Sequence, residues 1–201
     1  MRSMRLVVSG LWLVVLLPVT TTAQGQTLTG SPLVKALQAG GHVIVMRHAS
    51  SPSVIPTKPN ADNVPPERQL DEQGRKTTTA MGEALRRLKV PIGEVLTSPT
   101  YRARETARLI GFPNARSVPE LGEGTGTMQA VSPAQTGWLQ KKVREFPRNT
   151  NTVLITHVPN ASAAFPDIPA VDQGEALVFA PAGQRNVRLV GRIKIEGWPG
   201  L

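Results

Sequence analysis

The chain has 201 residues and a mass of 21.6 kDa, which fits one compact domain with a short extension and argues against a two-domain enzyme. It contains 23 Lys and Arg against 14 Asp and Glu, a net charge of +9, so anionic partners are favoured. The absence of cysteine excludes thiol catalysis, zinc–thiolate sites and disulfides. Aromatic residues make up only 4%, which argues against stacking platforms for nucleic acid, and we expect no nucleic-acid partner.

The first residues have the pattern of a secretory signal peptide. Arg2 and Arg5 precede an apolar stretch over residues 6–17, and Pro18 and small residues up to Ala23 follow it. That stretch is shorter than the roughly 20 residues that a membrane-spanning helix needs. We therefore expect a signal peptide over residues 1–23, a single domain over 24–201 and a periplasmic or secreted protein, with an uncleaved anchor as the alternative.

Helices and strands are expected to alternate along the rest of the chain. Serine caps a helix and proline fits its first turn, so three Ser-Pro pairs mark helix starts, and Asp71 marks a fourth. The expected helices begin at Ser31, Glu72, Ser98 and Ser132, and the last three run to about residues 88, 110 and 146. The expected strands are 42–46, 92–97, 114–118, 152–156, 176–180 and 187–195. This order predicts an α/β fold, a three-layer α/β/α sandwich whose central sheet is mostly parallel, with an antiparallel edge hairpin.

Two long segments contain neither a helical nor a strand pattern. Residues 50–68 carry five prolines together with Asn, Asp and Ser, and residues 120–131 are rich in Gly and Thr and contain Glu120 and Glu123. Loops of this length are often functional. We expect both to shape a substrate pocket, to which Lys58, Arg68 and Arg104 add positive charge.

The candidate chemistry lies at the strand ends, because ligands of open parallel sheets bind beyond the carboxyl ends of the strands. Two of the three histidines follow the two most apolar strands directly: His48, preceded by Arg47, and His157. Arg102 lies one turn into the helix after Ser98, where free backbone N–H groups and the helix dipole attract anions. A solvated basic helix face is the alternative interpretation of this arginine.

Together these residues resemble the histidine phosphatase superfamily, also called phosphoglycerate mutase-like, in its small branch 1 form. The resemblance rests on Arg47-His48-Ala49, on Leu70-Asp71-Glu72-Gln73-Gly74 and on Ser98-Pro99-x-x-Arg102-Ala103-x-x-Thr106-Ala107. It extends to Thr156-His157 and to Gly174-Glu175-Ala176-Leu177-Val178.

The resemblance implies a phosphatase that forms a phosphohistidine. His48 would accept the phosphoryl group, and Arg47, Arg102 and His157 would bind it. Guanidinium groups match phosphate oxygens, and positive charge nearby would lower the pKa of His48 and keep its ring nucleophilic. Glu123, with Glu120 as the second choice, would give the leaving group its proton.

The implied partner is a phosphorylated small-molecule substrate, with an anionic envelope surface as a possible second partner. No metal and no other cofactor are expected, and the oligomeric state is left open.

Three departures from the family pattern leave a second hypothesis open. Ala49 replaces the usual glycine, Thr156 replaces a common glycine before the second histidine, and the usual sequence after the acid is missing. The alternative is therefore a catalytically impaired module of the same fold that binds phosphate or an envelope ligand. A zinc hydrolase that uses His48, His157 and a glutamate is disfavoured, because Arg47 and Arg102 would repel the cation.

Overall fold

The computed structural model describes residues 27–55, 57–58, 67–123, 131–183 and 186–201. Its centre is a six-stranded sheet with the strand order β3-β2-β4-β1-β5-β6. The strands are β1 (His42–Arg47), β2 (Ile92–Thr97), β3 (Arg116–Ser117), β4 (Asn151–Thr156), β5 (Ala176–Pro181) and β6 (Val187–Ile193). No helix in the described ranges is long and apolar enough to cross a membrane, and the predicted signal peptide, residues 1–23, lies outside them.

The pairing of the strands confirms the predicted sheet. β4 pairs in parallel with both β1 and β2, and β2 pairs in parallel with β3. β5 runs antiparallel to β1 and to β6, which makes the expected antiparallel hairpin at one edge. The strands that precede the two candidate histidines, β1 and β4, are therefore direct neighbours near the middle of the sheet.

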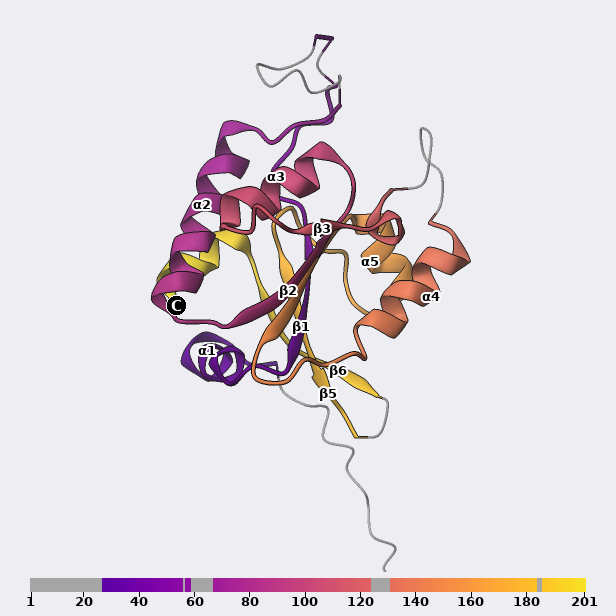
Figure 1. Ribbon diagram of the computed structural model, residues 1–201. Coiled ribbons are helices and arrows are strands. Elements are labelled where there is room, and N and C mark those ends of the chain that lie inside the picture. Colours follow the sequence, from indigo (N-terminus) through magenta and orange to yellow (C-terminus); the bar gives the residue numbers. More distant parts are fainter. Residues whose placement is uncertain (1–26, 56, 59–66, 124–130, 184–185) are drawn as a thin grey trace, which may run out of the picture.

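Helices cover both faces of the sheet and complete the predicted three layers (Figure 1). One face carries α1 (Gly30–Ala39), α2 (Glu72–Arg87), α3 (Tyr101–Ile110) and the C-terminal 3-10 helix η2 (Ile195–Gly200). The other carries α4 (Pro133–Lys142), α5 (Val158–Ala164) and the 3-10 helix η1 (Pro119–Leu121). In β1, Ile44 and Met46 pack into the first layer, whereas Val43 and Val45 pack into the second. This explains why β1 is apolar on both faces.

The helix starts were predicted correctly at two of four places. Ser132 caps α4 in a reciprocal capping box with Gln135, and the Asp71 side chain accepts a hydrogen bond from Gly74 N at 2.6 Å at the start of α2. The caps expected at Ser31 and Ser98 are wrong, because α1 begins at Gly30 and α3 begins at Tyr101. Ser98 instead continues the pairing of β2 with β4 through its backbone N–H. α4 also ends at Lys142, earlier than expected.

The first turn of α2 fixes the chain that leaves β1. Ser50 Oγ donates a hydrogen bond to Asp71 at 2.6 Å, and Asp71 N donates to the Ser50 carbonyl at 3.2 Å. A Cβ atom at Gly74 would lie 2.3 Å from the same carbonyl oxygen, so only glycine allows this approach. Two residues before Ser50 stands His48, and the helix therefore helps to set the position of the candidate nucleophile.

Candidate active site

The register of three parallel strands brings the candidate residues to one edge of the sheet. Arg47 is level with Thr156 on β4, and Thr97 is level with Ile155. The residue that follows each strand continues the pairing: His48 N donates to the Thr156 carbonyl at 3.1 Å, and Ser98 N donates to the Ile155 carbonyl at 2.9 Å. The side chains of residues 48, 98 and 157 consequently meet in one place.

His48 is buried, with 1% of its surface exposed, and its ring is held in one tautomer. Nδ1 lies 2.8 Å from the Ala49 carbonyl oxygen, which can only accept, so Nδ1 carries the proton. Nε2 then holds a free lone pair, and it accepts a hydrogen bond from Arg102 Nε at 3.1 Å. A ring nitrogen with an unprotonated lone pair that faces an arginine has the form that a nucleophile for phosphorus requires.

The pKa of His48 is lowered to about 3, and burial is the largest cause. The positive charges of Arg102 and Arg47 lower this pKa further, and the hydrogen bond to the Ala49 carbonyl opposes them. The sequence suggested that neighbouring charge would lower it, and in the structure that effect is smaller than the loss of solvent. His48 is therefore neutral throughout the physiological pH range.

Arg102 connects the two histidines. It is the second residue of α3, it is buried, and its Nη2 lies 3.3 Å from His157 Nδ1 while its Nε contacts His48. The two imidazole rings stand edge to face with their centres 5.2 Å apart. His157 Nε2 lies 2.8 Å from Ser98 Oγ. Burial lowers the pKa of His157, and the adjacent Glu123 opposes that effect.

Glu123 joins this cluster, whereas Glu120 does not. The Glu123 carboxylate forms an ion pair with Arg102 and lies 3.2 Å from His157 Nδ1. These contacts, that of His157 first, hold the pKa of Glu123 well below its usual range. Glu120 instead lines a separate cavity beside Trp138. The structure thus places the first of the two candidate acids at the site, directly against the groups that would bind phosphate.

Arg47 enters the site from the end of β1. Its Nη1 donates to the Val171 carbonyl at 3.3 Å, and its buried Nε contacts no hydrogen-bond partner among the described residues. Its charge acts on His48 and on Glu123. The late segment predicted from the sequence also lies here, because Gly174 N donates to the His48 carbonyl at 2.9 Å.

Arg68 is a third arginine of the site, and sequence reasoning gave it only a general electrostatic role. Its Nε and Nη2 donate to the carbonyls of Pro52 and Ser51, each at 2.9 Å, so the guanidinium is fixed by the loop that follows β1. Its charge acts on Arg47 and on His157. In the sequence, Arg68 stands two residues before Leu70-Asp71, where the family pattern begins its helix. This position was the signal that could have assigned Arg68 to the site.

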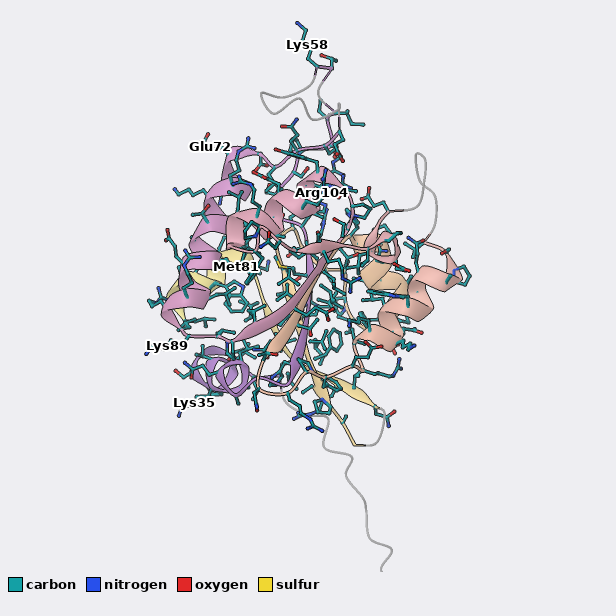
Figure 2. All side chains as sticks on the ribbon, in the orientation of Figure 1. Lys35, Lys58, Glu72, Met81, Lys89 and Arg104 are labelled. Atoms are coloured by element: carbon teal, nitrogen blue, oxygen red, sulfur yellow. The ribbon has the colours of Figure 1, made fainter. Side chains whose placement is uncertain are left out.

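The other two cations that were expected to add charge to the pocket lie elsewhere. Figure 2 shows Lys58 at the tip of its loop, away from the body of the protein. Arg104 lines a neighbouring cavity of about 430 Å³ together with Tyr101, Arg108 and Phe112. The positive charge of the site therefore comes from Arg47, Arg68 and Arg102.

Two departures from the family pattern have structural roles. Ala49 is fully buried within the core, and its N–H donates to Thr106 Oγ1 at 3.1 Å. The Thr156 hydroxyl donates to the Leu121 carbonyl at 2.9 Å. Neither side chain projects into solvent. Across the described residues, no group of three or more His, Cys, Asp or Glu side chains is arranged to hold a metal ion.

Two imidazoles, three guanidiniums and one carboxylate thus lie together at one edge of the sheet, with the Nε2 lone pair of His48 facing Arg102. The sequence matches the histidine phosphatase superfamily (branch 1) over residues 43–158, more than half of the chain, and the protein belongs to this family. No curated protein matches the chain.

Solved structures share the fold at low sequence identity. The protein histidine phosphatase SixA complexed with tungstate is 19% identical, with a TM-score of 0.57, over 77% of this chain and 97% of that one. A putative alpha-ribazole-5'-P phosphatase from Escherichia coli K-12 is 16% identical, with a TM-score of 0.58, over 78% and 98%. A mycobacterial glucosyl-3-phosphoglycerate phosphatase with inorganic phosphate is 16% identical, with a TM-score of 0.53, over 77% and 98%.

Proposed function

We propose that the protein is an exported phosphomonoesterase that transfers the phosphoryl group of its substrate to His48 and then to water. The observation that carries this proposal is the state of His48: a buried neutral ring whose free Nε2 lone pair faces Arg102. The structures of a neighbour with tungstate and of another with inorganic phosphate support it, since both ions are tetrahedral oxyanions.

In the first step, the phosphoryl group takes the place of the Glu123 carboxylate and accepts hydrogen bonds from Arg102 and His157. Arg47 and Arg68 add positive charge around the equatorial oxygens, where negative charge develops in the transition state. His48 Nε2 attacks phosphorus, the N–P bond forms, and the bond from phosphorus to the ester oxygen breaks. The guanidinium groups supply the charge for which other phosphatases use metal ions, so the mechanism includes no metal.

Glu123 provides the proton that the leaving oxygen needs. Contacts with His157 and Arg102 lower its pKa in the ligand-free site. Once the phosphoryl group has taken over those contacts, Glu123 loses them and faces a negative charge, and both changes raise its pKa. Glu123 thus takes a proton from solvent and donates it to the ester oxygen, and the alcohol leaves. In the second step the carboxylate takes a proton from the attacking water, the water oxygen bonds to phosphorus, and the N–P bond breaks, which releases phosphate and restores neutral His48.

The intermediate provides the test. The purified protein should release phosphate from 4-nitrophenyl phosphate in the presence of a metal chelator, and an alkaline quench should trap phosphate on His48, located by peptide mapping. His48→Asn should remove both signals. His42→Asn is the matched control, because His42 starts β1 at the opposite end of the strand and should keep both. Full activity of His48→Asn would overturn the mechanism.

The same assay decides the alternative of a binding module without turnover, which the ion-paired Glu123 keeps open. Vanadate binding without hydrolysis of any phosphate ester in a broad panel would establish that alternative. For the export part of the proposal, the N-terminal residue of the secreted protein should be Gln24, the residue after Ala23. An intact Met1 on protein found inside the cell would contradict export.

A further inference from the structure

The segment that leads to Glu123 is held by side chains from three other elements. Asn160 Nδ2, on α5, donates to the carbonyls of Gly122 at 3.0 Å and of Glu120 at 3.3 Å. Gln135 Nε2, on α4, donates to the Gly122 carbonyl at 3.0 Å. The Thr156 hydroxyl, at the end of β4, donates to the carbonyl of Leu121, which stands between them. All three carbonyls from 120 to 122 are therefore bound.

The Gly122 carbonyl decides the orientation of Glu123. A peptide unit is planar, so the Gly122 oxygen and the Glu123 N and Cα atoms move as one body. The oxygen has two lone pairs, and the amides of Asn160 and Gln135 use both. Glycine at 122 gives the backbone wide freedom of rotation, so without these two donors the plane would be free to turn.

We propose that Asn160 and Gln135 are positioning residues that hold Glu123 in reach of the leaving-group oxygen. This inference rests on the proposed function. Asn160 is 1% exposed, and both of its hydrogen bonds go to this segment, which fits a role in holding the segment. Thr156, the replacement for a common glycine in the family pattern, adds the third contact.

The chemistry of the leaving group separates positioning from general structural support. Nitrophenolate leaves readily without a proton, whereas an alkoxide requires one in the transition state. General acid catalysis contributes about 10²- to 10⁴-fold, and it depends on placement within hydrogen-bond reach. Displacement of Glu123 should therefore lower kcat/KM, which reports phosphoryl transfer to His48, for alkyl phosphates and leave kcat/KM for 4-nitrophenyl phosphate nearly unchanged. A merely structural defect would lower both kcat/KM values together.

Gln135→Glu is the sharpest variant. Gln135 Oε1 accepts a hydrogen bond from Ser132 N in the capping box, and glutamate keeps that contact while it loses the amide donor to Gly122. Gln140→Glu is the matched control on the same helix, because Gln140 Nε2 donates at 3.1 Å to the Ala164 carbonyl, away from the acid. Assays at low and high salt remove the effect of the added charge, which salt screens.

For Gln135→Glu we expect kcat/KM for an alkyl phosphate such as glycerol 3-phosphate to fall about tenfold, with less than about twofold change for 4-nitrophenyl phosphate. Asn160→Asp, which replaces the donor by a carboxylate against two carbonyls, should give a larger loss of the same kind, if it folds. Gln140→Glu should leave both values near those of the wild type.

Glu123→Gln separates the two proposals. If kcat/KM falls selectively for the alkyl substrate, Glu123 is supported as the acid. If kcat/KM changes by the same factor for both substrates, that role is overturned. If Glu123→Gln shows the selective loss but Gln135→Glu shows none, the positioning proposal is wrong and the proposed function stands. A fall in both rates for Gln135→Glu would equally overturn it, and Gln135→Glu alone decides if Asn160→Asp does not fold.

Discussion

The lowered pKa of His48 makes the stability of the protein depend on pH in a calculable way. Its ordinary value is 6.5, and in the folded protein it is about 3. Between these values the unfolded chain binds a proton at His48 and the folded chain does not. The contribution of His48 to the free energy of unfolding is therefore fully present above pH 6.5 and is lost as the pH falls towards 3.

The magnitude follows from the distance to 6.5. About pH 5 lies 1.5 units below the ordinary pKa of His48, and each unit lowers the free energy of unfolding by about 1.36 kcal/mol. The loss at that pH is therefore about 2 kcal/mol. This figure does not depend on the folded value as long as that value stays below about 4. The perturbation is His48→Gln, which removes the titrating group but leaves His157 and the carboxylates in place.

Urea unfolding at about pH 7 and pH 5 measures the difference. Wild type should lose about 2 kcal/mol more between these two conditions than His48→Gln does. The comparison uses the change in the free energy of unfolding between the two pH values, so the pH-independent cost of the substitution cancels. NMR titration of the His48 ring gives a direct check, and we expect no change in its signals above about pH 4. Equal pH dependence of wild type and variant, or a His48 titration near 6.5, would refute the reasoning.

Four further outcomes are expected. Glu123→Gln should lower the inhibition constant of vanadate about three- to tenfold, because the arginine and histidine donors no longer face a carboxylate, and an unchanged constant would contradict this. Ala49→Gly should cost about 1 kcal/mol in thermal unfolding without a change in vanadate inhibition, since the methyl group packs in the core; tighter inhibition would show that it crowds the anion. Gly82→Ala should cost about 2 kcal/mol or more, because its Cβ would lie 2.2 Å from a backbone carbonyl of α3. Gly137→Ala, with open space around it, should stabilise α4 by about 0.5–1 kcal/mol in the same melts.

The strand ends could be predicted from the sequence because burial leaves a strong pattern. The continuous apolar runs before His48 and His157 identified both strands, and the rule for parallel sheets placed the two rings at one edge. Glu123 was the first choice for the acid, and it does lie against Arg102. The catalytic roles of these residues stay predictions until the variants are measured.

The contacts that complete the site could not be predicted, because they join side chains to the backbone of distant loops. Arg68 binds two carbonyls 16 and 17 residues away, and Asn160 binds carbonyls 38 and 40 residues away. Such bonds need only a donor and a correctly turned peptide, and neither leaves a periodic pattern in the sequence. The caps at Ser31 and Ser98 failed for a related reason: local propensity alone does not decide where tertiary hydrogen bonds allow a helix to begin.

Glu123 is part of the chain, so its carboxylate acts as a tethered anion beside Arg102 and His157. Its local concentration there does not fall when the protein is diluted. A free anion enters only if it gains more from the guanidiniums than this single negative charge does. In the proposed mechanism a doubly charged phosphoryl group would gain more, whereas an anion with one charge, such as chloride, would not. Glu123 would then make the site select ligands by their charge, before the rest of the substrate makes any contact.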